Sequence, residues 1–231
     1  MPSILITGAN RGIGFELAKQ YQKVGWQVFA CCRNPLTAYD LKALNTRANN
    51  PIAIIHLDVA NPENIKQLPS LVRVHALDIL FNNAGVWEPS QGGFGTIEAE
   101  SWLEVFKVNT MASLLIAQAL IKPIANSELK LIANMSSGMA SISGNTEGNA
   151  YVYRSSKAAL NAVTKSMAID LKVQGITVVA IDPGWVKTDM GGANAPTTPI
   201  DAVSGIREVL ERVSLQESGS YIRYNGQMVP W

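Results

Sequence analysis

The stretch SILITGANRGIG, residues 3–14, decides the class of fold. Its first half is apolar and β-branched, which predicts a buried strand, and an amphipathic helical pattern follows at about 12–22. Between them, Gly8, Gly12 and Gly14 are spaced for a tight turn, a close approach of a pyrophosphate and close helix–strand packing. The helix start would offer N–H groups to phosphates, so the stretch predicts a dinucleotide-binding unit. The alternative is an ordinary strand–turn–helix whose glycines serve geometry alone.

The rest of the chain alternates apolar runs with amphipathic segments. Further strands are expected at 26–32, 52–58, 77–83, 129–137 and 176–184, and further helices at about 62–73, 101–124, 153–173 and 201–212. Strands that are apolar at nearly every position are buried on both faces, as in a parallel sheet. The 231 residues contain no linker or repeat. We therefore predict an α/β fold over 1–231, a single-domain Rossmann-type doubly wound parallel sheet with helices on both faces.

Composition limits the partners. Lys and Arg number 19 against 18 Asp and Glu, without a long basic tract, which argues against nucleic acid or an anionic membrane. The N-terminal apolar run is too short for a signal peptide, and no apolar stretch approaches a membrane span. Cys31 and Cys32 are neighbours on a predicted strand and point to opposite faces, so two reduced thiols are expected. We expect a cytoplasmic protein with no nucleic-acid partner and no membrane partner, and assign no metal ligand.

Two arginines bear on the choice of dinucleotide. At the end of the second predicted strand, NAD-specific proteins normally carry Asp or Glu for the ribose 2′-hydroxyl. Here Arg33 stands at that point, with no carboxylate until Asp40, and Arg11 immediately precedes Gly12 in the glycine turn. Guanidinium groups suit bidentate phosphate contacts, so we favour NADPH/NADP+ over NADH. The alternative is that either arginine is a solvated surface residue.

The stretch AYVYRSSKAAL, residues 150–160, contains a candidate proton donor. Tyr153 and Lys157 are four residues apart and share a helix face, whereas Tyr151 lies on another face and is expected to precede the helix. An ammonium about 4–5 Å from the phenol oxygen stabilises the phenolate by roughly 3–4 kcal/mol at an effective dielectric near 20. Desolvation acts in the opposite direction. We predict that Lys157 lowers the pKa of Tyr153, which then protonates an alkoxide formed from a carbonyl.

Other polar residues lie near the same predicted strand ends. Ser136 and Ser137, in NMSSG, both have a hydroxyl placed to bind the substrate oxygen. Asn109 interrupts an apolar stripe in FKVNTMAS, and its side chain serves either a structural hydrogen bond or the site. In an open α/β sheet, ligands bind outside the carboxyl ends of the strands. Two Gly- and Pro-rich loops, 86–100 and 188–200, follow strand ends, and the second is long enough to form a mobile lid.

Together these motifs resemble the short-chain dehydrogenase/reductase family. TGANRGIG, NNAG, Asn109, NMSSG, Tyr153-x-x-x-Lys157 and DPGWVKTDMGG stand in the family's order. Within the family, the chain is similar to Sniffer-type carbonyl reductases and C-factor-like proteins. The interval from Ser137 to Tyr153 is longer than is usual in the family, with 143–149 as the insertion, so the choice between the two serines stays open.

The resemblance implies an NADPH-dependent carbonyl reductase acting on a small carbonyl or alcohol substrate, with a homodimer or homotetramer as possible assemblies. It implies Tyr153 as general acid and base, Lys157 as its partner and ribose ligand, Ser137 as the group that polarises the carbonyl, and Asn109 as the holder of a relay water. The cofactor would contact a larger set: Gly8, Asn10, Arg11, Gly12, Ile13, Gly14, Arg33, Asp58, Val59, Asn83, Ala84, Gly85, Tyr153, Lys157, Pro183, Gly184, Val186 and Thr188. Candidate substrate contacts are Ser136, Trp87, Trp185 and Met190. The alternative is a C-factor-like signalling or regulatory protein that binds the dinucleotide with little catalysis.

Overall fold

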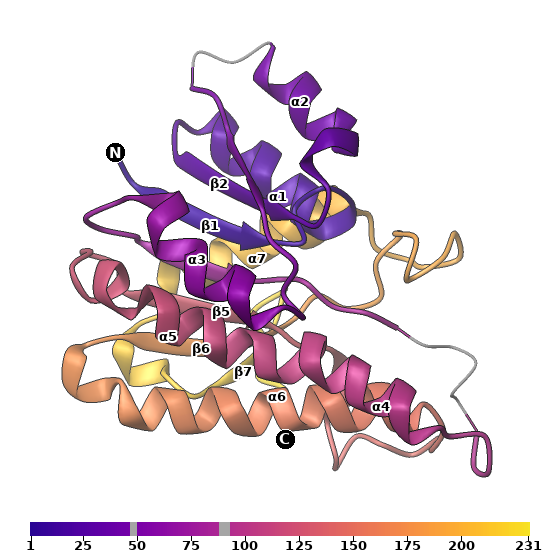
Figure 1. Ribbon diagram of the computed structural model, residues 1–231. Helices are drawn as coiled ribbons and strands as arrows, with labels where there is room; N and C mark the ends of the chain where they lie inside the picture. The colour runs from indigo at the N-terminus through magenta and orange to yellow at the C-terminus, as the bar shows by residue number, and fades with distance from the viewer. Residues whose placement is uncertain (47–49, 88–92) are drawn as a thin grey trace.

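The computed structural model describes residues 1–46, 50–87 and 93–231. Within these residues, seven strands form one sheet in the order β3-β2-β1-β4-β5-β6-β7, and every adjacent pair is parallel (Figure 1). The strands are β1 (Ser3–Thr7), β2 (Gln27–Cys32), β3 (Ala53–His56), β4 (Ile79–Asn82), β5 (Leu131–Met135), β6 (Thr177–Asp182) and β7 (Tyr221–Arg223). Because the strand order reverses between β1 and β4, a crevice is expected at the carboxyl ends of these two strands.

Helices cover both faces of the sheet, which confirms the predicted doubly wound architecture. They are α1 (Gly12–Lys23), α2 (Tyr39–Asn45), α3 (Pro62–Val72), α4 (Ala99–Phe106), α5 (Ala112–Ala125), α6 (Tyr151–Asp170) and α7 (Pro199–Arg212), with short turns η1 (Pro35–Thr37), η3 (Lys107–Met111), η4 (Gly138–Ala140), η5 (Lys172–Gln174) and η6 (Leu215–Glu217). Helices α1 and α7 lie on one face, and α3, α5 and α6 lie on the other (Figure 1).

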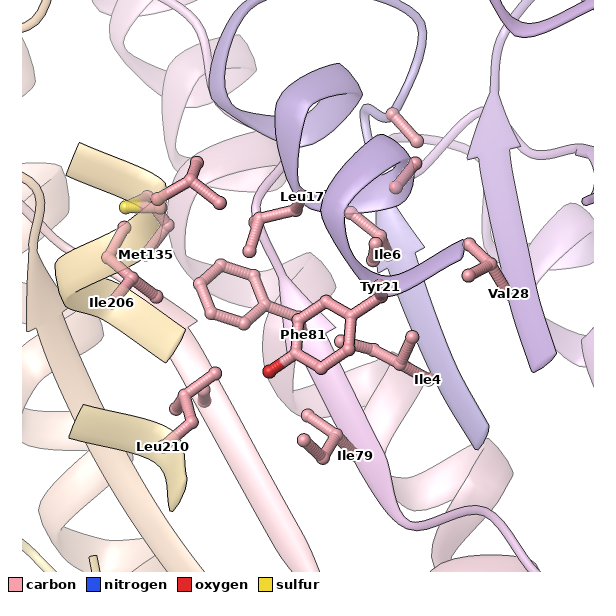
Figure 2. Close-up of a cluster of buried hydrophobic side chains, with 14 of the residues drawn as sticks. Ile4, Ile6, Leu17, Tyr21, Val28, Ile79, Phe81, Met135, Ile206 and Leu210 are labelled. Carbon is pink, nitrogen blue, oxygen red and sulfur yellow. The ribbon is translucent and has the colours of Figure 1, made fainter. Parts of the chain in front are cut away.

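The first strand shows how one sequence serves two cores. Ile4 and Ile6 pack into the cluster beneath α1 and α7, whereas Leu5 packs into the cluster beneath α3, α5 and α6. Figure 2 shows the first cluster, in which the rings of Tyr21 and Phe81 lie among aliphatic side chains from both helices and the sheet. Successive strand side chains point to opposite faces. Burial on both faces therefore explains why β1 is apolar throughout.

Several boundaries differ from those expected. The single helix predicted at 101–124 is α4 and α5 joined by η3, a π-helical turn. Tyr151 was expected to precede the helix, but α6 begins at Tyr151, which therefore lies in its first turn. Helix α2 and strand β7 were not predicted, because seven and three residues are too few to show a periodicity. Of the predicted loop at 86–100, residues 88–92 lie outside the described residues, and α4 already begins at Ala99.

Of two expectations based on composition, one is wrong and one is confirmed. The segment Ala99–Ala125 is, by length and composition, apolar enough to cross a membrane, although no such stretch was expected. Its apolar residues include Ile116, Leu120 and Ile124, which are buried against the sheet, and a core helix passes the same test. Cys31 and Cys32 are both buried free thiols, as expected.

Candidate active site

The glycine turn lies at the carboxyl end of β1, at the topological switch. Gly12 has a positive φ of 56°, in the region that favours glycine, and a Cβ there would lie 3.3 Å from Cγ2 of Thr188. At Gly14, a Cβ would lie 2.4 Å from the carbonyl oxygen of Gly8, so α1 packs directly on the turn. Helix α1 has no side-chain cap and no acidic residue in its first turn. Its N-terminus is therefore suited to an anionic group.

The end of β4 is tied to this turn by hydrogen bonds. The main-chain N–H groups of Asn83 and Ala84 both donate to Oγ1 of Thr7, at 3.0 and 2.9 Å. The Asn83 amide donates to the carbonyl oxygens of Thr7 and Gly8, at 2.8 and 3.1 Å. The Asn83 side chain therefore stabilises the glycine turn. This structural role is distinct from the cofactor contact that the resemblance implies.

The two arginines occupy exposed positions. Nη1 of Arg11 lies 3.0 Å from Oδ2 of Asp189, and the two side chains are 66% and 76% exposed. Arg33 is exposed at the end of β2, and Asn10 is exposed within the glycine turn. The structure thus joins Arg11 to the 188–200 segment, so the shared role of Arg11 and Arg33 at a 2′-phosphate stays a prediction.

Asp58 and Val59 follow β3. The Asp58 carboxylate accepts from the N–H of Ala60 at 3.0 Å, and the main-chain N–H of Asp58 donates to Oδ1 of Asn64 at 3.2 Å. Val59 is buried, whereas Asp58 is partly exposed. Because Asp58 follows the carboxyl end of β3, it lies at the same edge of the parallel sheet as the glycine turn, and its contact with an adenine stays a prediction.

Ser137 and Lys157 flank Tyr153. The Ser137 hydroxyl lies close enough to the phenol to lower the pKa of Tyr153. Nζ of Lys157 lies 5.9 Å from the centroid of the Tyr153 ring and donates to the carbonyl oxygen of Met135 at 2.7 Å. A Cβ at Gly85 would lie 3.4 Å from both Nζ of Lys157 and Oδ1 of Asn109. The ends of β4 and β5 and the start of α6 therefore bring these predicted residues together.

The pKa values differ from the prediction for Tyr153. Desolvation by the surrounding protein raises the pKa of Tyr153, the Ser137 hydroxyl lowers it, and the Asp182 carboxylate raises it further. Burial lowers the pKa of Lys157 from its usual value to about 8. The predicted lowering of the Tyr153 pKa is therefore wrong, because the pKa is raised. Desolvation disfavours the charged form of each group, and the ammonium is directed at the Met135 carbonyl.

The two serines of NMSSG have different environments. Ser136 is 2% exposed, and its hydroxyl donates to Oδ1 of Asn161 at 2.7 Å. Ser137 is partly exposed, and its Oγ accepts from the N–H of Met139 at 3.2 Å while lying beside the phenol of Tyr153. The structure brings Ser137 to the site and turns Ser136 into the core.

Asn109 lies in the π-helical turn η3, and its side chain is fully engaged. Oδ1 accepts from the N–H of Val86 at 2.8 Å, and Nδ2 donates to the Val86 carbonyl oxygen and to Oγ of Ser156, both at 3.0 Å. The side chain thus makes structural hydrogen bonds, which was one of the two alternatives considered for Asn109. It ties the irregular segment that follows NNAG to α6 through Val86 and Ser156, and π-helical turns of this kind often mark functional sites.

Three apolar residues were proposed as substrate walls. The Trp87 ring lies 4.7 Å from the Tyr153 ring, centroid to centroid, in an edge-to-face arrangement. The exposed Trp185 donates from its indole nitrogen to the Gly191 carbonyl oxygen at 2.7 Å, and Met190 is half-exposed. The structure thus places Trp87 directly beside the phenol, whereas Trp185 folds back on the 188–200 segment.

The 188–200 segment begins beyond the end of β6. Gly184 donates from its N–H to Oδ1 of Asp182 at 3.0 Å, while Pro183 and Val186 are buried. Lys187 and Thr197 are joined by a main-chain hydrogen bond of 2.9 Å, and the segment between them projects from the body of the molecule (Figure 1). Thr188, at its start, lies against Gly12 of the glycine turn. A cleft of about 390 Å³ separates the two, lined by Arg11, Gly12, Phe15, Glu16, Lys187, Thr188, Asp189, Thr198, Pro199 and Ile200.

Sequence reasoning missed two groups that border the site. Asp182 is buried at the end of β6 and pairs with Arg223 of β7, with Nε and Oδ2 2.8 Å apart. The Tyr221 hydroxyl donates to the carbonyl oxygen of Ser137. A carboxylate at the end of an apolar strand was a visible sign for Asp182, whereas a three-residue strand gave none for Tyr221.

Comparisons with known proteins agree with this geometry. The protein named C-signal from Myxococcus xanthus is 37% identical over 158 residues, covering 67% of this chain and 93% of that protein. The carbonyl reductase Sniffer of D. melanogaster has a TM-score of 0.93 at 34% identity, over 100% of both chains. A carbonyl reductase from chicken fatty liver, solved with NADPH bound, has a TM-score of 0.92 at 32% identity, over 100% of this chain and 99% of that one.

The family follows from these findings. A family model described as short chain dehydrogenase matches residues 2–198, which is most of the chain. The resemblance inferred from the motifs is confirmed, including its similarity to Sniffer-type and C-signal proteins. The chain belongs to the short-chain dehydrogenase family, and it is an oxidoreductase of that family.

Proposed function

We propose that this protein is an NADPH-dependent carbonyl reductase in which Tyr153 is the general acid. The observation that supports it most is the arrangement of Tyr153, with the Ser137 hydroxyl beside its phenol and buried Lys157 one helical turn further along α6. The similarity to two carbonyl reductases, one of them with NADPH bound, agrees with this chemistry.

The residues at the switch point fit the cofactor. The start of α1 has no side-chain cap and no acidic residue in its first turn, so its N–H groups are suited to a pyrophosphate. Arg11 and Arg33 are exposed cations on the same edge, and no carboxylate follows β2 before Asp40. When bound, NADPH supplies the hydride that reduces the carbonyl carbon. The chain's own residues then have to position the carbonyl and deliver a proton to its oxygen.

Proton delivery is assigned to Tyr153. Because its pKa is raised, the phenol is protonated at neutral pH and available as an acid. A protonated Lys157 nearby stabilises the phenolate that remains after transfer, and its pKa of about 8 keeps much of it charged near neutrality. The Ser137 hydroxyl binds the same substrate oxygen and orients it toward the phenol. With the Asn109 side chain engaged, the main chain of the η3 turn is the part proposed to hold a relay water.

The proposed substrate is a small aldehyde, ketone or dicarbonyl, or the corresponding alcohol in the reverse reaction. Trp87, beside the phenol, forms one apolar wall of its site. The protein works in the cytoplasm without a nucleic-acid or membrane partner, and a homodimer or homotetramer remains part of the proposal.

Turnover of a carbonyl panel tests the proposal. Oxidation of NADPH and of NADH is followed at the nicotinamide absorbance with aldehydes, ketones and dicarbonyls. We expect reduction of at least one compound, with NADPH preferred. The Tyr153→Phe variant should lose about 10²- to 10⁴-fold in kcat with NADPH affinity nearly unchanged, because only the proton donor is removed.

The matched control is Tyr151→Phe, which removes the hydroxyl of a half-exposed tyrosine in the first turn of the same helix. It should turn over like the wild type, and a large loss there instead would contradict the assignment of Tyr153. NADPH binding without turnover across the panel would favour the alternative of a dinucleotide-binding regulatory protein.

A further inference from the structure

The main chain around Ser137 is not held by regular secondary structure. Strand β5 ends at Met135, and the last sheet-like hydrogen bond runs from the Ser136 N–H to the Ile181 carbonyl oxygen at 2.7 Å. Ser137 itself has an extended backbone, with φ −167° and ψ 147°, and caps η4. The direction of its hydroxyl therefore depends on contacts from other parts of the chain.

Two such contacts hold the peptide group that follows Ser137. The Tyr221 hydroxyl donates to the Ser137 carbonyl oxygen, and the N–H of Gly138 donates to Oδ1 of Asp182 at 2.9 Å. Both polar ends of the single peptide group between Ser137 and Gly138 are thus held by side chains from β6 and β7. We propose that Tyr221, together with the Asp182–Arg223 pair, positions Ser137 for the carbonyl reduction proposed above, on which this assignment rests.

The Asp182 carboxylate is itself held rigidly. It is 1% exposed, and its two oxygens bind Nε of Arg223 at 2.8 Å and the N–H groups of Gly138 and Gly184. A buried carboxylate needs such partners, since an unpaired one is strongly destabilising. A Cβ at Gly138 would lie 3.3 Å from Oδ2 of Asp182, so the η4 turn rests closely on the carboxylate.

Tyr221 is fixed equally well. It is 1% exposed, packs with Ala140 and Ala180, and stacks on Trp231 with ring centroids 5.4 Å apart. The Trp231 carbonyl oxygen accepts from the N–H groups of Ile142 and Ser143, so the C-terminal segment also binds the chain beyond η4. Burial raises the pKa of Tyr221, which keeps its hydroxyl protonated as a donor.

Register explains why the two contacts act together. Ala180 pairs with Tyr221 and Asp182 pairs with Arg223 across the β6–β7 ladder. Tyr221 and Arg223 are two residues apart on one strand, so their side chains point to the same face, toward the turn that follows β5. A three-residue edge strand thus connects the C-terminal segment to the residue that would bind the substrate oxygen.

A double-mutant cycle tests the assignment. In the full chain, Tyr221→Phe removes the hydroxyl, and we expect kcat to fall about 10- to 100-fold while the KM for NADPH is unchanged, because misplaced catalytic groups lose rate more than binding. In a Ser137→Ala background the same change should have no further effect on kcat. Tyr21→Phe is the control, a buried tyrosine of α1 that packs on Trp26 and Arg207.

A pH profile separates positioning from a loss of stability. Because the Ser137 hydroxyl lowers the Tyr153 pKa, displacing it should move the acidic limb of kcat for alcohol oxidation to higher pH. Tyr221→Phe should show this shift, and Tyr21→Phe should not, with thermal unfolding recorded for both.

The outcomes distinguish two failures. An unshifted profile, or losses from Ser137→Ala and Tyr221→Phe that multiply, overturns the positioning assignment alone while wild-type turnover persists. Absence of turnover in the wild type itself overturns the proposed function and this assignment with it.

Discussion

The two halves of the sheet edge are built differently. At the ends of β1 and β4, the predicted cofactor side is shaped by the main chain, with Thr7 Oγ1 accepting from two N–H groups and an exposed Arg11 above. At the ends of β5 and β6, the predicted catalytic side consists of buried polar side chains such as Lys157 and Asp182. We therefore expect substitutions on the predicted cofactor side to change cofactor binding with little loss of stability, and substitutions on the predicted catalytic side to change both activity and stability.

Among the changes that test this comparison, those at the two neighbouring serines have the largest expected effect. Ser137→Ala should lower kcat about 10²- to 10³-fold, since it removes a donor aimed at the oxygen where charge develops. Ser136→Ala should leave most of kcat, yet cost about 1–3 kcal/mol of unfolding free energy, because Oδ1 of Asn161 loses its buried partner. Steady-state kinetics and urea unfolding of both variants check this. A loss of kcat confined to Ser136→Ala would reverse the assignment.

Lys157 links the catalytic side to the pH dependence of stability. Its folded pKa of about 8 lies below its usual value of 10.5, so between these pH values the unfolded chain binds more protons than the folded one. The free energy of unfolding should therefore rise with pH through this window, by roughly 3 kcal/mol from this residue. Unfolding of the wild type and of Lys157→Met at pH 8 and pH 10 isolates the term.

The sign of the difference between these two proteins is decisive. The wild type should gain stability relative to Lys157→Met as the pH rises from 8 to 10. A constant difference would mean that folding does not lower the pKa of Lys157.

The same contrast explains what the sequence could predict. The glycine turn follows from local spacing, because Gly8, Gly12 and Gly14 act through their own backbone and the strand beside them. The fold class follows from the strongly apolar strands. The choice of Ser137 over Ser136 depends on Asn161, 25 residues away, and on Tyr221, 84 residues from Ser137. Sequence spacing contains no information about contacts made at such separations.

The Tyr153–Lys157 pair shows an intermediate case. Helical spacing gave the shared face, and the two residues do lie together on α6. The predicted direction of the Tyr153 pKa change was wrong. Neither the desolvation of the phenol nor the hydrogen bond of Lys157 to the Met135 carbonyl oxygen can be inferred from the spacing of two residues on a helix. Sequence spacing can thus predict that two residues lie together, but not the direction in which their surroundings shift a pKa.

On the cofactor side, the smallest expected effect concerns Arg11 and Asp189. Their ion pair is exposed, so it contributes about 0–1 kcal/mol to stability, and either alanine variant should unfold close to the wild type. Arg11→Ala should weaken NADPH binding about tenfold and leave NADH binding nearly unchanged, because only NADPH has the 2′-phosphate. Asp189→Ala should act in the opposite direction and strengthen NADPH binding a few-fold, since it frees the guanidinium and removes a carboxylate that repels phosphate.

Fluorescence titration of both variants with NADPH and with NADH measures these changes in affinity. Equal changes for NADPH and NADH would show that Arg11 serves only the 188–200 segment, and a large loss of stability in either variant would remove the contrast between the two edges.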